Sequence, residues 1–153
     1  SKTYNIAGFH CSVAIIPNAE LRQRFQSARQ GMLSSVGLMG LIAAQVAYRD
    51  SQSWLGELLG YLEQNRDLTY RFVNERLPGI SMGLPEGMFL AWLDCRQAGI
   101  KGNPQQFFLE RARVGLSEGT FFGPDGAGFV RLNFGCCRDT LTRALQRMEN
   151  ALS

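Results

Sequence analysis

Two basic side chains stand out in this sequence as groups that could do chemistry, Lys2 and Arg131. Lys2 lies in the opening stretch SKTYNIAG, with two hydroxyl groups and an amide around it. A lysine near a chain end is usually a solvated charge, and the alternative is that this amine has a role inside a longer chain. Arg131 lies in FVRLNFG, where an arginine in a strand most often forms a surface ion pair. A guanidinium group also presents paired donors that match a carboxylate.

The cysteines and the single histidine do not form a metal-binding pattern. The four cysteines are Cys11, Cys95, Cys136 and Cys137, and the histidine is His10. No C-x-x-C pair is present and no histidine stands at ligand spacing, so we expect no structural zinc site. Because no secretory signal is visible, the cysteines are interpreted as reduced, mostly buried residues of a cytoplasmic protein.

The composition is that of an ordinary globular protein. The chain has 153 residues, of which 45% are hydrophobic and 19% charged, with a net charge of +3. The arginines of residues 21–31 are separated by glutamines and apolar residues, which favours a solvated helix face over nucleic-acid binding. The most apolar stretch, VGLMGLIAA at residues 36–44, is much shorter than the roughly 18 residues of a membrane span. We therefore expect neither a nucleic-acid nor a membrane partner.

The first half of the chain predicts one strand and three helices. The β-branched run VAII at residues 13–16 predicts a buried strand. Asn18 is expected to cap a helix that ends at Gly31. A second helix over residues 34–49 is apolar nearly all round and must be covered on several sides. A third, long amphipathic helix begins near residue 51 and ends near Leu77, before a Pro-Gly pair.

In the second half the hydrophobic period changes to two, which indicates strands mixed with helices. The Asn103-Pro104 pair predicts the start of a helix that reaches about Arg113. Short connections favour an antiparallel sheet backed by helices, which is an α+β fold. The predicted strands lie at residues 80–83, 88–94, 114–117 and 129–135, and the last helix lies at residues 139–152.

Residues 1–50 do not make a complete domain. They supply a strand and two apolar helices but no sheet for these to cover, so we expect them to belong to a larger body. Residues 51–153, which include the long helix, are expected to form a small α+β domain of their own. The chain is therefore interpreted as a fragment of a longer protein.

Three separated stretches carry a resemblance to a known family: SKTYNIAG, PEGMFLAWLD and FVRLNFGCCR. In this order they resemble the carboxy-terminal part of fold-type I pyridoxal-phosphate (PLP) enzymes of the aminotransferase class I/II family. The likeness is strongest to the MalY/PatB subgroup, the cystathionine β-lyase-like C–S lyases. The resemblance implies that residues 1–50 are the remnant of a PLP-binding large domain and residues 51–153 the small carboxy-terminal domain.

The resemblance also implies roles for individual residues. Lys2 matches the lysine that forms the internal aldimine with PLP and moves a proton from the substrate α-carbon, and Ser1 matches a residue close to the cofactor phosphate. Arg131 matches the arginine that holds the substrate α-carboxylate. His10 stands where many relatives have a basic phosphate partner, with packing as an equal alternative. Trp92 is interpreted as a core residue.

The implied activity of the full-length parent is β-elimination from cystathionine-like amino acids by a homodimer. An aminotransferase, which uses the same lysine, arginine and cofactor, is the alternative within the family. A non-catalytic interaction or regulatory module, acting through exposed helices such as residues 34–49, is the alternative from another class. The family's ring-nitrogen partner and most of its phosphate site precede the lysine, so residues 1–153 alone are expected to be inactive.

Overall fold

A computed structural model describes residues 1–29, 31 and 35–153 of the chain. These residues divide into two compact units, Ser1–Leu58 and Leu59–Ser153, here called unit 1 and unit 2. The boundary falls inside one long helix, and the assignment of residues 1–50 to a cofactor-binding domain stays a prediction.

Unit 1 is mostly helical. Asn18 caps its first α-helix as predicted, because its side-chain Oδ1 accepts a hydrogen bond from the backbone N–H of Leu21 at 3.0 Å. The start predicted for the second helix, at residue 34, lies outside the described residues. The elements are a 3₁₀ turn (Ala7–Phe9), α1 (Ala19–Arg29), α2 (Leu38–Asp50) and the first residues of α3 (Gln52–Arg76).

The strand predicted at residues 13–16 is wrong. These residues form no strand, and the side chains of Val13 and Ile15 are 78% and 86% exposed. A strand needs a neighbour to bond its backbone, and no other strand lies among the described residues of unit 1. Helix α2 buries only Gly40 and Ala47. The cover predicted for this apolar helix is thus not supplied by the described residues of its own unit.

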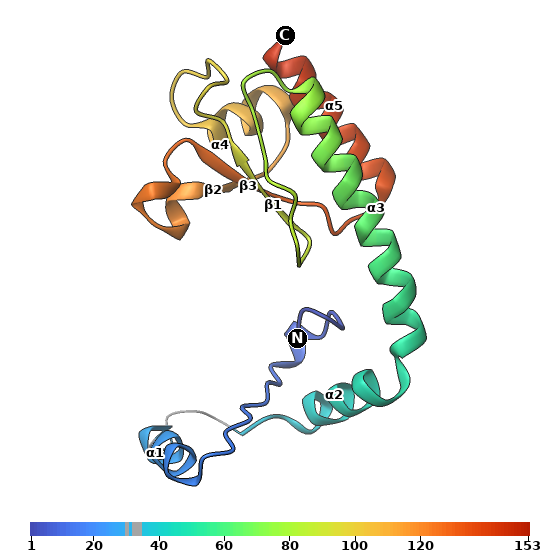
Figure 1. Cartoon of the computed structure of the whole chain (residues 1–153), viewed down its shortest axis with the longest axis vertical. Coiled ribbons are helices and arrows are strands. Elements are labelled where there is room, and N and C mark those ends of the chain that lie inside the picture. Colours follow the sequence, from blue (N-terminus) through green and yellow to red (C-terminus); the bar gives the residue numbers. More distant parts are fainter. Residues whose placement is uncertain (30, 32–34) are drawn as a thin grey trace. The chain divides into compact units, whose positions relative to one another are not determined.

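Unit 2 is an α+β structure built on a three-stranded antiparallel sheet, as predicted (Figure 1). The strand order is β1 (Leu90–Asp94), β3 (Phe129–Asn133), β2 (Ser117–Glu118). β1 and β3 are shorter than predicted, and β2 shares only Ser117 with the strand predicted at residues 114–117. Residues 80–83 contribute only a single bridge between Ser81 and Asp94. Besides the strands and the rest of α3, the elements are α4 (Pro104–Phe107), a π-helical turn (Phe108–Ala112), two 3₁₀ turns (Gly119–Phe122 and Pro124–Gly126) and α5 (Arg138–Leu152).

The start of α4 confirms the predicted cap. The side-chain Oδ1 of Asn103 accepts hydrogen bonds from the backbone N–H groups of Gln105 at 2.8 Å and Gln106 at 3.3 Å. Pro104 occupies the first helical position, where its missing N–H leaves no bond unmade. The helix then continues as the π-helical turn, so the predicted helix exists with irregular geometry in its second half.

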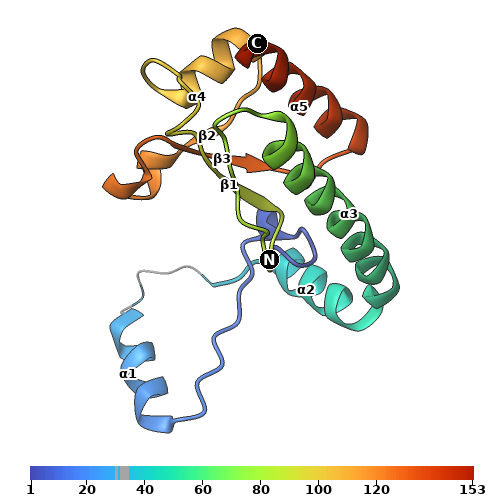
Figure 2. The ribbon, with the colours of Figure 1, turned by 45° about the horizontal axis from the view of Figure 1, so that its top comes forward.

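The core of unit 2 lies on one face of the sheet. Alternate strand residues Ala91, Leu93, Val130 and Leu132 are buried there. Figure 2 shows α3 and α5 side by side next to the sheet, and both helices contribute buried side chains to the same cluster. From α5 these are Leu141, Leu145 and Met148, while Leu152 is partly buried.

A buried asparagine ties α3 to the segment between β3 and α5. The side-chain amide of Asn65 donates hydrogen bonds to the backbone carbonyls of Phe134 and Cys136, both at 2.9 Å. Near the other end of the helices, Arg76 of α3 pairs with Glu149 of α5 at 2.8 Å. The two helices therefore run in the same direction. The long-range bonds of Asn65 satisfy a polar group that would otherwise destabilise the interior.

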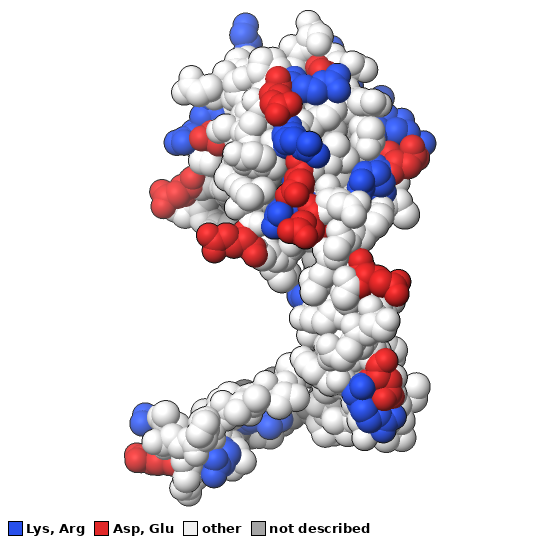
Figure 3. Space-filling model, turned by 45° about the vertical axis from the view of Figure 1, so that its right-hand side comes forward, with Lys and Arg blue, Asp and Glu red and all other residues white. Residues whose placement is uncertain are grey.

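Charged side chains of both signs lie next to one another on the face drawn in Figure 3. Neighbours such as Arg49 and Asp50 form ion pairs, here at 2.8 Å. Exposed pairs of this kind contribute little stability, because water screens them. A membrane-crossing helix needs a long apolar run, and none of the helices in the described part of the chain has one.

Candidate functional site

The predicted cofactor lysine lies in a turn at the start of unit 1. The backbone carbonyls of Ser1 and Lys2 accept hydrogen bonds from the N–H groups of Ile6 at 3.0 Å and Asn5 at 3.2 Å. The Oγ of Ser1 donates to the carbonyl of Cys11 at 3.3 Å. Lys2 is exposed, and its amine makes no hydrogen bond or ion pair within residues 1–29, 31 and 35–153. The amine is therefore accessible to an electrophile from solvent.

A tyrosine within this turn fixes it to the rest of unit 1. Tyr4 is buried, and its hydroxyl accepts a hydrogen bond from the Gln52 side chain at 2.7 Å. Its ring packs edge-on against Tyr48 of α2, with ring centroids 4.9 Å apart. His10, by contrast, is exposed and has a left-handed backbone with φ of 51°. The anchor of the segment is thus an aromatic residue that the sequence analysis did not single out.

The predicted carboxylate-binding arginine lies on the face of the sheet that is turned away from the core. Its neighbours Val130 and Leu132 point into the core, so Arg131 points to the opposite side. In the strand register Arg131 stands between Trp92 of β1 and Ser117 of β2. Its Nη2 donates a hydrogen bond to the Ser117 Oγ at 3.2 Å. This bond fixes one end of the guanidinium group.

An aromatic ring covers the guanidinium group of Arg131. The Cζ atom of Arg131 lies 4.5 Å from the ring centroid of Phe122, and Phe122 in turn packs edge-on against Trp92 at 5.6 Å. Trp92 is 39% exposed, so its assignment to the core is wrong, because strand alternation places it beside Arg131. Within the described residues Arg131 forms no ion pair, which leaves its remaining N–H groups to bind an external carboxylate.

The loop that carries Phe122 is held by two glycines in backbone contact. A methyl group on Gly126 would lie 2.1 Å from the carbonyl oxygen of Gly119, and one on Gly119 would lie 2.2 Å from that of Gly126. Only glycine fits at either position without a shift of the backbone. This contact could not be predicted from the sequence, because the spacing of glycines does not show which of them touch.

Charged and aromatic groups continue along the same face of the sheet. Phe129 stacks on Trp92 with centroids 5.6 Å apart, and the guanidinium of Arg96 lies 4.6 Å from the Phe129 ring centroid. Arg96 donates to both carboxylate oxygens of Asp94, at 2.9 and 2.7 Å. These bonds to Arg96 hold the pKa of the Asp94 carboxyl below its ordinary value. Asp94 is therefore committed to Arg96 and does not neutralise Arg131.

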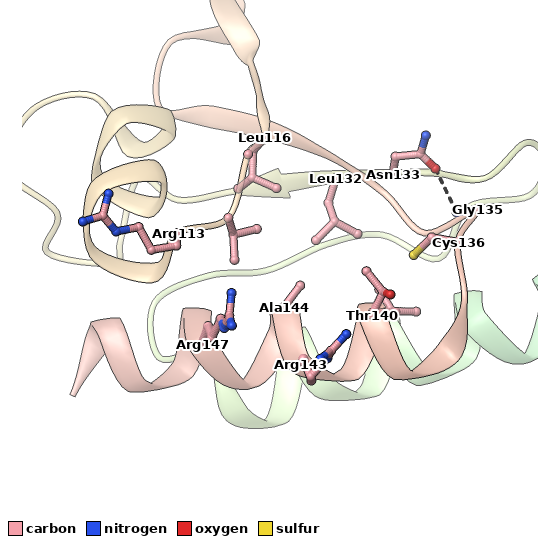
Figure 4. Close-up of a pocket in the computed structure, with 13 residues that line it drawn as sticks. Arg113, Leu116, Leu132, Asn133, Gly135, Cys136, Thr140, Arg143, Ala144 and Arg147 are labelled. Carbon is pink, nitrogen blue, oxygen red and sulfur yellow. Dashed lines mark hydrogen bonds between the residues drawn. The ribbon is translucent and has the colours of Figure 1, made fainter.

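A separate pocket of about 490 Å³ lies on the other side of β3 (Figure 4). Leu132 lines it from the core-facing side of the strand, and Arg143 and Arg147 line it from α5. Arg143 is paired with Asp139 at 3.1 Å. Arg131 is not among the lining residues, so the pocket is distinct from the predicted carboxylate site.

The predicted site residues fall into both units. Ser1 and Lys2 belong to unit 1 and Arg131 belongs to unit 2. The side chains of Ser1 and Lys2 are exposed and that of Arg131 is half-buried. The roles expected for all three stay predictions. Ser117 and Phe122 are the contacts of Arg131 that sequence reasoning missed.

Comparison with known proteins shows which family has this fold and these residues. The family model for aminotransferase class I and II matches residues 1–148, and the chain belongs to this family. Cystathionine beta-lyase PatB of Bacillus subtilis is 38% identical over 155 residues, which cover all of this chain and 40% of PatB.

Solved structures show the same relationship. The crystal structure of OvoB is 47% identical and superposes with a TM-score of 0.92, covering 99% of this chain and 39% of OvoB. Cystalysin from Treponema denticola, whose crystal structure contains a PLP cofactor, is 29% identical with a TM-score of 0.88, covering 98% of this chain and 39% of cystalysin. The chain thus spans about 40% of the length of PatB.

Proposed function

We propose that this chain is the carboxy-terminal part of a PLP-dependent C–S lyase that acts on sulfur amino acids of the cystathionine type. The family membership and the likeness to PatB and cystalysin support the proposal. The observation that carries it is the half-buried guanidinium of Arg131, which is held by Ser117 and Phe122 and has donors to spare. An amino-acid substrate offers the carboxylate that such a group binds.

The residues at the start of the chain fit the aldehyde end of PLP. An aldehyde condenses with a primary amine, and the Lys2 amine is exposed and makes no bond within the described residues. When bound, PLP supplies an electron sink for the substrate α-carbon. In the proposal Lys2 holds the cofactor, and its Nζ then takes the proton from the α-carbon. Ser1 would contact the phosphate, in exchange for the hydrogen bond that its Oγ gives to Cys11.

Arg131 is proposed to bind the α-carboxylate of the substrate. Its planar guanidinium presents parallel N–H donors that match the two oxygens of a carboxylate. The bond to the Ser117 hydroxyl uses one donor of Nη2 and leaves the others open. Removing one partner of such a charge-assisted pair weakens binding by about 2–5 kcal/mol. We therefore expect Arg131→Ala to raise the KM for the amino acid at least about tenfold.

The proposed reaction breaks the C–S bond of the substrate by β-elimination. With one water molecule, cystathionine would give pyruvate, ammonia and a thiol. The test is to incubate the whole protein and PLP with cystathionine and to measure thiol and pyruvate release. The control is amino transfer to a keto acid in the same preparation.

The role of Lys2 has a matched control in the chain, whose lysines are Lys2 and Lys101. We expect Lys2→Ala in the whole protein to abolish thiol release and Lys101→Ala to leave it unchanged. After borohydride reduction with PLP, mass spectrometry should find the cofactor mass on the peptide of Lys2. Full activity of Lys2→Ala, or a cofactor mass on Lys101 instead, would remove Lys2 from the proposed site.

An aminotransferase is the second candidate, because the chain belongs to the aminotransferase class I and II family. Transamination would use the same Lys2 and Arg131, because both reactions begin by removing the α-proton. Amino transfer to a keto acid without thiol release from cystathionine would select this alternative.

We further propose that the whole protein works as a homodimer in the cytoplasm. The free thiols of Cys11, Cys95, Cys136 and Cys137 suit a reducing compartment. A role as an interaction module remains the alternative of another class, supported by the exposed apolar side chains of α2, among them Leu38 and Met39. Light scattering of the whole protein distinguishes a dimer from larger assemblies, and lyase activity argues against a purely non-catalytic role.

A further inference from the structure

Three aromatic rings form a continuous row on the face of the sheet that carries Arg131. We call Phe129, Trp92 and Phe122 the aromatic row. Phe129 stacks on Trp92 with ring planes 14° apart, and Phe122 packs edge-on against Trp92 with planes 80° apart, each at 5.6 Å. Phe122 then covers the guanidinium of Arg131 at 4.5 Å. The row thus ends on the group that is proposed to bind the substrate.

Both ends of the aromatic row are fixed. At one end Arg96 lies over Phe129 and is itself bonded to both oxygens of Asp94. At the other end the loop that carries Phe122 is closed by the backbone contact between Gly119 and Gly126. Phe122 is 53% exposed, so burial alone does not hold it; its contacts with Trp92 and Arg131 do.

We propose that Phe122, supported by Trp92, is a positioning residue that orients the Arg131 guanidinium for the substrate carboxylate. This inference rests on the proposed function. The ring lies against the guanidinium, with its centroid 4.5 Å from Cζ, and the Ser117 hydroxyl accepts a hydrogen bond from Nη2. A carboxylate then meets the remaining N–H groups along the edge of the group, which is the direction that two parallel hydrogen bonds require.

The physical advantage lies in preorganisation. A free arginine side chain has many rotamers, and a binding site that must order it loses affinity. A ring in contact with the guanidinium, together with the hydroxyl bond, selects one orientation before the substrate arrives. The effect concerns binding of the carboxylate, which is present in every step of the reaction. It should therefore appear in KM and not in kcat.

The test compares neighbouring phenylalanines in the whole protein. We expect Phe122→Ala and Phe122→Leu to raise the amino-acid KM about three- to tenfold, with kcat within about twofold of wild type. Leucine keeps the apolar volume but lacks the ring face. Phe122→Tyr keeps the ring and should restore the wild-type KM. Phe121→Ala is the matched control, because Phe121 is 79% exposed and makes no ring contact within the described residues.

A double-mutant cycle separates this inference from the proposed function. In an Arg131→Ala background, Phe122→Ala should have no further effect on KM, because the group it orients is gone. If Arg131→Ala raises KM and Phe122→Leu leaves it at the wild-type value, the positioning role is wrong and the carboxylate site stands. If Arg131→Ala itself leaves KM unchanged, the proposed carboxylate site fails.

Discussion

Cysteines in unit 2 differ in their surroundings, and this decides their reactivity. Cys95 is buried, and burial raises the pKa of its thiol to about 12, with the nearby Asp94 carboxylate adding to the effect. Cys136 is partly buried and its pKa is also raised, mainly by burial. Cys137, which precedes α5, is exposed. The burial expected for most of the cysteines therefore holds for Cys95, holds in part for Cys136 and fails for Cys137.

This contrast predicts selective alkylation of the folded chain. With iodoacetamide at about pH 8, Cys137 should react first and Cys95 should stay unmodified until the protein unfolds, because only the thiolate reacts. Peptide mass spectrometry with and without urea measures both sites. Modification of Cys95 at the rate of Cys137 in the folded protein would contradict the buried position.

The buried thiol of Cys95 makes the stability of the folded chain depend on pH in the alkaline range. The pKa of Cys95 is about 12 in the folded chain against 9.0 as the ordinary value, so folding favours the protonated form. The contribution of the protonated Cys95 thiol to the free energy of unfolding is present below about pH 9 and is lost as the pH rises toward about 12. The free energy of unfolding of a Cys95→Ala variant should therefore fall less steeply than that of the wild type between about pH 9 and 11.

At the scale of the element, two glycines determine the conformation of the loop between β2 and β3. Gly119 and Gly126 approach so closely that neither accepts a methyl group without backbone movement. The loop places Phe122 against Arg131, so the conformation of the loop affects the candidate site. The sequence shows many glycines here, and only the folded backbone shows which two are in contact.

Gly126→Ala should consequently destabilise unit 2 by about 1–3 kcal/mol, as insertions into tightly packed regions do. Urea unfolding measures this change. Gly115→Ala is the matched control, since nothing lies within 4 Å of the position of its added methyl group. Equal stability of the two variants would show that the loop relaxes freely.

The helices of the chain and the strands β1 and β3 were largely predictable, whereas the strand expected at residues 13–16 does not form. Asn18 and Asn103 cap helices through side-chain bonds to nearby backbone N–H groups, and such local chemistry is visible in the sequence. A strand depends on a neighbour that is remote in the sequence. Residues 13–16 have strong β propensity and yet form no strand, because no partner strand lies in the described part of unit 1.

On the scale of the whole molecule, burial is divided unequally between the two units. The main hydrophobic core, with Leu93, Val130 and Leu145, lies entirely in unit 2. Helix α1 has no buried residue, and in unit 1 the buried apolar residues among those described are Tyr4, Cys11 and Ala47. Since burial of apolar surface is the main source of stability, unit 2 should be the stable part of the isolated chain.

Amide hydrogen exchange of the 153-residue chain tests this expectation. Amides of β1, β3 and α5 should exchange roughly 1000-fold or more slowly than those of α1, a difference of about 4 kcal/mol in opening free energy. Peptide-level mass spectrometry resolves these elements. If the amides of α1 were protected as strongly as those of β1, β3 and α5, the expected difference in stability between the two units would be wrong.

The sequence by itself determined the family, the positions of the helices and the α+β class of the carboxy-terminal half. Motifs and helix caps are local patterns, which can be recognised from the order of the residues alone. The sequence also singled out Lys2 and Arg131, whose roles stay predictions.

Only the tertiary structure decided what surrounds these groups. It placed Trp92 beside Arg131 instead of in the core, brought Phe122 and Ser117 onto the guanidinium, and left residues 13–16 without a strand partner. The physical reason is that strand register and loop closure join residues that are far apart in the chain. Their contacts depend on which backbones pair, and a pattern within one segment does not contain that information.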